Sequence, residues 1–131
     1  MNSSEFGLNQ IGQIAIPVGD LERAVAFYRD ELGMRFLFQA PPGLAFFDCG
    51  GVRLMLDVSA KGQQNQFASI IYYKVNDLPS AFETLKSRGV IFEQGPELVT
   101  RMPDHELWMA FLKDPDGNLL GLMWEKFAFS S

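Results

Sequence analysis

Hydrophobic and polar positions follow the same pattern twice along the chain. The stretch from Gln13 to Ala24 reads QIAIPVGDLERA, and much of it returns 57 residues later, from Ile70 to Ala81, as IIYYKVNDLPSA. In each copy an apolar, strand-like run leads to an aspartate, Asp20 or Asp77, and apolar positions at helical spacing follow it. The pattern predicts two copies of one structural unit.

The first unit is predicted to contain a strand, a helix and three further strands. Residues 11 to 18 are largely apolar and end near Pro17, as a strand would. Asp20 is the expected N-cap of the helix, and Gly33 is the expected left-handed residue at its end. Short Pro-Gly and Gly-Gly turns then separate three expected antiparallel strands, at residues 34–39, 44–49 and 52–58. The first unit is therefore βαβββ.

The second unit repeats this plan after a polar linker. We expect a strand at 67–75, a helix capped by Asp77 and ended by Gly89, and three more strands from residue 90 to Trp124. The boundaries are module 1 at about 10–58, a linker at 59–66 and module 2 at about 67–126, within one domain over 1–131. The predicted fold class is α+β: two tandem βαβββ modules forming a cupped eight-stranded mixed sheet.

Alternation along the strands assigns their side chains to two faces. Ile14, Ile16 and Val18, with Leu54 and Leu56, should face the helix, as should Ile71, Tyr73 and Val75 in module 2. The opposite face should carry Gln13, Ala15, Arg53, Met55 and Asp57 in module 1, and Ile70, Tyr72, Lys74, Gly121 and Met123 in module 2. If these opposite faces curve toward one another, they enclose a cavity.

Composition narrows the classes of partner. Hydrophobic residues make up 47% of the 131 residues, and the apolar runs are shorter than a membrane span requires. A net charge of -5 without Lys or Arg runs argues against a nucleic-acid partner. The N-terminus lacks the features of an export signal, and the lone Cys49 excludes an intrachain disulfide, so we expect a cytoplasmic protein. Whether residues 1–6 are native stays open.

Several motifs together resemble a known family. The segments IGQIAIPVGDLERAVAFYRDELGM, VNDL and LKDPDGNLLGLM occur in order and look like the vicinal oxygen chelate superfamily, which includes glyoxalase I, extradiol dioxygenases, fosfomycin-resistance thiol transferases and bleomycin-resistance proteins. The resemblance implies a glyoxalase-like half-barrel and a homodimer. The modules then pair either within one chain or between chains.

The family's metal positions are filled unusually in this chain. The resemblance transfers the ligand positions of metal-dependent members to Gln13, Met55, Ile70 and Gly121, and only Gln13 supplies an oxygen ligand. Using Asp57 in place of Met55 gives two ligands, whereas a divalent ion needs about three N or O donors. We therefore expect no metal and no other cofactor.

These observations lead to two functional hypotheses. The first is a metal-free protein that binds a small organic molecule, as bleomycin-resistance proteins do, with these candidate ligand-binding residues: Gln13, Arg53, Met55, Asp57, Tyr72 and Trp108. The alternative is a lyase, isomerase or dioxygenase that uses a divalent metal, or a metal-free enzyme with His105 as the catalytic base. The sequence leaves open which hypothesis holds and which ligand is bound.

Overall fold

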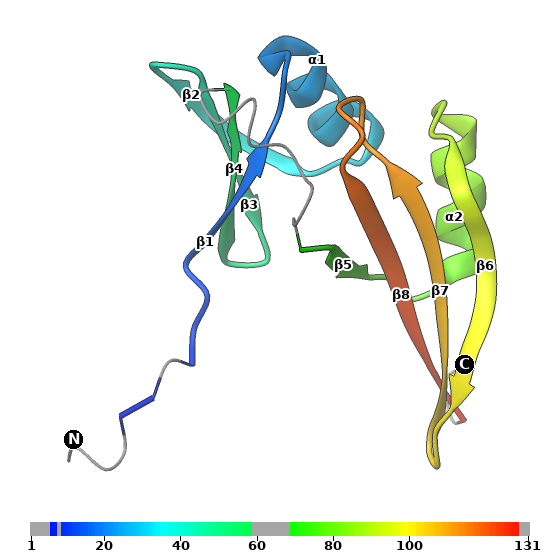
Figure 1. Ribbon diagram of the computed structural model, residues 1–131. Helices are drawn as coiled ribbons and strands as arrows, with labels where there is room; N and C mark the ends of the chain where they lie inside the picture. The colour runs from blue at the N-terminus through cyan, green and yellow to red at the C-terminus, as the bar shows by residue number, and fades with distance from the viewer. Residues whose placement is uncertain (1–5, 8, 59–68, 129–131) are drawn as a thin grey trace.

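The computed structural model of the protein describes residues 6–7, 9–58 and 69–128, and it consists of two modules of the same build (Figure 1). Module 1 comprises β1 (Gln13–Pro17), α1 (Leu21–Ala26), the π-helical turn η2 (Phe27–Glu31), β2 (Arg35–Ala40), β3 (Leu44–Cys49) and β4 (Val52–Asp57). Module 2 comprises β5 (Ile71–Lys74), α2 (Leu78–Ser87), β6 (Phe92–Arg101), β7 (His105–Lys113) and β8 (Leu119–Phe127). The predicted tandem βαβββ plan is confirmed.

The eight strands form two separate four-stranded sheets in the described residues. Their orders are β1-β4-β3-β2 and β5-β8-β7-β6, and the first strand of each module pairs in parallel with the last. Ala15 lies beside Met55 in the first sheet, and Tyr72 lies beside Gly121 in the second. The sequence repeat therefore places equivalent residues at equivalent points of both sheets.

The helix ends are set by the expected residues. The carboxylates of Asp20 and Asp77 accept hydrogen bonds from the amides of Arg23 and Ser80, both at 3.1 Å. Gly33 adopts a φ of 74°, a left-handed conformation that favours glycine.

Some element boundaries differ from the prediction. The first helix changes after Ala26 into η2, in which the amide of Leu32 donates to the carbonyl of Phe27. β5 begins at Ile71 rather than at residue 67, and Phe67 and the predicted linker at 59–66 lie outside the described residues. No helix in the described part of the chain is long and apolar enough to cross a membrane.

One hydrophobic core joins the two modules. The buried cluster contains helix-facing residues of both sheets, including Ile16, Leu54 and Leu56 from module 1 and Leu112 and Leu120 from module 2. The helix-facing sides of the two sheets thus converge within one chain. The opposite sides, here called the cup faces, point away from this shared core.

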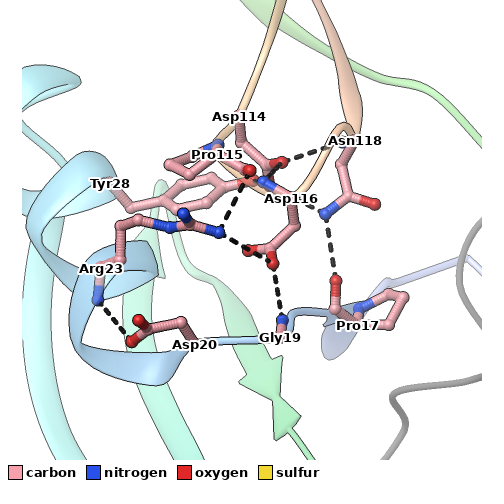
Figure 2. Close-up of polar contacts among 9 residues, drawn as sticks. All are labelled: Pro17, Gly19, Asp20, Arg23, Tyr28, Asp114, Pro115, Asp116 and Asn118. Carbon is pink, nitrogen blue, oxygen red and sulfur yellow. Dashed lines mark hydrogen bonds and ion pairs between the residues drawn. The ribbon is translucent and has the colours of Figure 1, made fainter.

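A buried carboxylate at the turn after β7 holds the modules together (Figure 2). Asp114 is 5% exposed; its Oδ2 accepts hydrogen bonds from the Tyr28 hydroxyl at 2.8 Å and from Asn118 Nδ2 at 2.8 Å. Its Oδ1 accepts from the amides of Asp116 and Asn118. Burial, and next the negative Asp114, raise the pKa of Tyr28, so the phenol keeps its proton and donates.

Neighbouring residues extend this contact to β1 and α1. Asn118 Nδ2 also donates to the carbonyl of Pro17 at 3.0 Å, and Asp116 Oδ1 accepts from the amide of Gly19 at 2.7 Å. Arg23 donates to the carbonyl of Pro115 at 3.3 Å. The Asp114–Asn118 turn of module 2 is therefore fastened to module 1 by side chains of both modules.

Replacing Asp114 should weaken the whole domain. In Asp114→Ala, the buried Tyr28 hydroxyl and Asn118 amide lose their acceptor, and we expect unfolding free energy to fall by about 3 kcal/mol. Urea unfolding followed by circular dichroism measures this change. Asp30→Ala is the control, because within the described residues the ion pair of Asp30 is with the adjacent, exposed Arg29. Equal stability of both variants would contradict the proposed importance of the contact.

Candidate functional site

The cup face of module 1 combines polar groups with a sulfur atom. Gln13, Arg53 and Met55 lie on adjacent strands, β1 and β4, as the alternation predicted. The amide nitrogen of Gln13 lies 3.7 Å from the Met55 sulfur, and the Arg53 guanidinium lies over the ring of Phe46, at 5.7 Å from its centroid. Asp57 follows on β4 and is half-buried.

Two aromatic rings on this face were missed by the sequence reasoning. Phe46 pairs with Met55 across β3 and β4, and Phe38 of β2 lies next to it, with ring centroids 4.8 Å apart. Phe38 is 48% exposed. Alternation along β3 could have located Phe46: because Phe47 belongs to the core, its neighbour Phe46 must belong to the opposite face, which is the cup face.

The cup face of module 2 is built around Tyr72. Its ring lies above Gly121: a Cβ placed on that glycine would lie 2.5 Å from Tyr72 Cδ2 and 3.2 Å from the ring of Phe111. Tyr72 packs edge-on against Phe111, with ring centroids 5.8 Å apart, and remains 41% exposed. The absence of a side chain at Gly121 is what allows the ring to lie over the sheet.

Charged and sulfur-containing side chains continue this face. Lys74 forms an ion pair with Glu125 at 3.3 Å, and Met123 pairs with Met109 between β8 and β7. Both cup faces thus offer aromatic rings and methionine beside a few charged groups, which suits contact with a partly apolar molecule.

The structure places two of the predicted residues away from this cluster. Trp108 has the strand parity of the buried Ala110, pairs with Trp124 and packs against the core, so it lies on the helix-facing side. His105, the candidate base, is the first residue of β7. Its side chain belongs to the same face of β7 as that of Phe111, but the two residues are six positions apart, or about 20 Å along the strand.

His105 has a local carboxylate partner. Its Nδ1 lies 2.8 Å from Asp104 Oδ1, and its ring packs on Phe127, with centroids 4.8 Å apart. An imidazole oriented by a carboxylate is an arrangement that general bases use. The structure does not bring this pair together with Gln13 or Tyr72, and the role of His105 as a base stays a prediction.

The residues at the family's metal positions do not form a ligand set. Gln13 contacts the sulfur of Met55, Ile70 offers only a hydrocarbon side chain, and Gly121 lies beneath the ring of Tyr72. Across the described residues, no three His, Cys, Asp or Glu side chains are grouped to hold an ion. A divalent metal needs more N or O donors than these positions supply.

Adding a methyl group at Gly121 should displace Tyr72. We expect Gly121→Ala to lower the free energy of unfolding by about 1 kcal/mol, and Tyr72→Ala to remove most of that loss in the double variant. A double-mutant cycle by urea unfolding tests the coupling. Gly12→Ala is the control, because a Cβ there would meet nothing within 4 Å. Additive effects of the two substitutions would show that the contact does not matter.

Known proteins resemble this chain in sequence. The family model of the Glyoxalase/Bleomycin resistance protein/Dioxygenase superfamily matches residues 10–122. The uncharacterized protein YraH of Bacillus subtilis (strain 168) is 28% identical over an alignment of 126 residues. The match covers 82% of this chain and 92% of YraH.

Solved structures share the fold. A superfamily member from Sphaerobacter thermophilus DSM 20745 has a TM-score of 0.72 at 26% identity and covers 90% of this chain and 98% of its own. TnmS3, an antibiotic binding protein from Streptomyces sp. CB03234, has a TM-score of 0.74 at 24% identity, over 93% of this chain and 100% of its own. With its repeated modules and its family match, the chain belongs to the Glyoxalase/Bleomycin resistance protein/Dioxygenase superfamily.

Proposed function

We propose that this protein binds a small organic molecule on its cup faces without using the superfamily's metal. The observation that carries the proposal is the position of Tyr72, whose ring covers Gly121, one of the transferred metal positions. An aromatic surface therefore stands where a metal-dependent member would need a ligand atom. Such a surface favours contact with an apolar or aromatic molecule.

The two cup faces have complementary properties for this role. Phe38 on module 1 and Tyr72 on module 2 supply exposed aromatic contact area, and each packs against a more buried ring, Phe46 (8% exposed) and Phe111. Gln13, Arg53 and Asp57 supply hydrogen-bonding groups at the edge of the aromatic area. Binding sites for organic molecules commonly combine predominantly apolar walls with a few such polar groups. The same-fold TnmS3 is described as an antibiotic binding protein, which supports the choice of ligand class.

A second copy of the chain would complete the site. Within one chain the cup faces point away from the shared core, and Phe38 and Tyr72 are 48% and 41% exposed. Ile11, which precedes β1, is 65% exposed. We therefore propose a homodimer in which the cup face of module 1 in one chain meets the cup face of module 2 in the other chain. The lone Cys49 fits a cytoplasmic location for this dimer.

Ligand binding should depend on Tyr72 and not on a metal. We expect polycyclic aromatic compounds such as 2-naphthol to raise the melting temperature of the wild type, because a ligand at 100 times its Kd adds about 2.7 kcal/mol. Tyr72→Ala should abolish the rise, and the control Ile91→Ala, at an apolar residue that is 80% exposed and outside the strands, should keep it.

Metal analysis by mass spectrometry of protein purified without chelator completes this test. The proposal expects less than stoichiometric Ni, Zn, Fe and Mn. One equivalent of such a metal that is lost in Gln13→Ala would overturn the metal-free site and favour the metal-dependent lyase, isomerase or dioxygenase.

The oligomeric state should respond to charge on the cup faces. Light scattering after gel filtration is expected to give the mass of two chains for the wild type. Phe38→Glu should give one chain, because a carboxylate there cannot be desolvated without a partner, whereas Ile91→Glu should remain a dimer. A monomeric wild type would contradict the proposed closure of the site.

A further inference from the structure

A cavity lies between the modules, lined largely by residues of the helix-facing sides of the sheets. It has a volume of about 490 Å³, in the range of small-molecule sites. Residues of both modules line it. Module 1 contributes the segment between η2 and β2 and the β3–β4 turn, and module 2 contributes β5, α2, Leu112 of β7, and Leu120 and Leu122 of β8. Met34 and Cys49 belong to the module 1 wall, and Ala81, Leu85 and Leu122 to the module 2 wall.

One polar group among these walls lacks a partner. The hydroxyl oxygen of Tyr73 is buried and has no hydrogen-bond partner among the described residues. A buried hydroxyl without a partner is unfavourable, so a bound oxygen atom that accepts a hydrogen bond from it would be stabilised. Burial, followed by the influence of Cys49, raises the pKa of Tyr73, and the phenol therefore remains a neutral hydrogen-bond donor.

We propose that this cavity is a second binding site, for a small, largely hydrocarbon molecule with one carbonyl oxygen that accepts a hydrogen bond from Tyr73. Met34, Leu85 and Leu122 supply aliphatic lining that matches the hydrocarbon part, and the unpaired Tyr73 hydroxyl matches the acceptor. Arg35, Asp48 and Lys74 border the same cavity as charged residues. The ligand contacts both modules, so its binding stabilises their arrangement within the chain. The Tyr73 donor is separate from the cup faces, because Tyr72 and Tyr73 lie on opposite faces of β5, whereas Lys74 of the module 2 cup face also borders the cavity.

Cys49 provides a site-specific reporter. It is the only cysteine of the chain and it lines the cavity. Burial, and secondarily Asp48, raise the pKa of its thiol, so labelling by 5,5'-dithiobis(2-nitrobenzoate) is best followed at mildly alkaline pH. A molecule in the cavity should slow this labelling.

Two probes test the proposal, the ketone 1-tetralone and its hydrocarbon counterpart tetralin. We expect 1-tetralone to slow Cys49 labelling in a saturable manner and to bind about fivefold more tightly than tetralin. Tyr73→Phe should remove that preference by weakening 1-tetralone about fivefold, the equivalent of one hydrogen bond. Ala81→Leu fills the α2 wall and should abolish protection by both probes, while Tyr72→Ala should leave it unchanged.

The outcomes separate this site from the cup faces. Melting temperature without probe establishes that each variant is folded. Absence of protection by 1-tetralone up to its solubility limit, or equal protection in wild type and folded Ala81→Leu, overturns the second site. Protection that is lost in Tyr72→Ala assigns the probe to the cup faces, which also rejects the second site but leaves the proposed function intact.

Discussion

The arrangement of the molecule depends on one buried carboxylate, that of Asp114. Its two oxygens accept from Tyr28 of module 1 and from the turn of module 2 that contains it. A buried carboxylate is tolerated because it is hydrogen-bonded on both oxygens. The contact draws the helix-facing sides of the sheets together into one core, and the cup faces are consequently left on the outside of the chain.

The cup faces show how a duplicated unit acquires two different surfaces. At the same point of the two sheets, module 1 places Ala15 beside Met55, and module 2 places Tyr72 beside Gly121. A small residue next to a large one fills similar space in both, but the large side chain has moved from the last strand of the module to the first. This exchange places the Tyr72 ring over a position that metal-dependent relatives require for a ligand.

Much of the fold could be predicted from the sequence because its signals are local. Asp20 and Asp77 cap helices through their own side chains, and alternation correctly separates Leu54 from Met55. The Asp114 contacts could not be predicted, because Tyr28 lies 86 positions away along the chain. Trp108 shows the same limit: a tryptophan on a strand suggests a ligand platform, but the register with Trp124 places it on the helix-facing side, against the core.

The candidate site was accessible to sequence reasoning only in part. Parity correctly grouped Gln13, Arg53 and Met55, since it depends on strand direction alone. It could not reveal that the cup faces of one chain point apart, because that follows from contacts between modules. It also gave no sign that residues of β5 and of the end of β3 line a cavity near the buried Tyr73 hydroxyl.

We propose that a second chain closes the outward cup faces. The most direct measurement is an isotope-filtered nuclear Overhauser experiment on dimers that pair a ¹³C-methyl-labelled chain with an unlabelled chain. Closure by a second chain predicts contacts between chains at the methyl group of Met55, on the cup face, and none at the methyl groups of the fully buried Leu56. Between-chain contacts confined to the helices, with none at Met55, would contradict it.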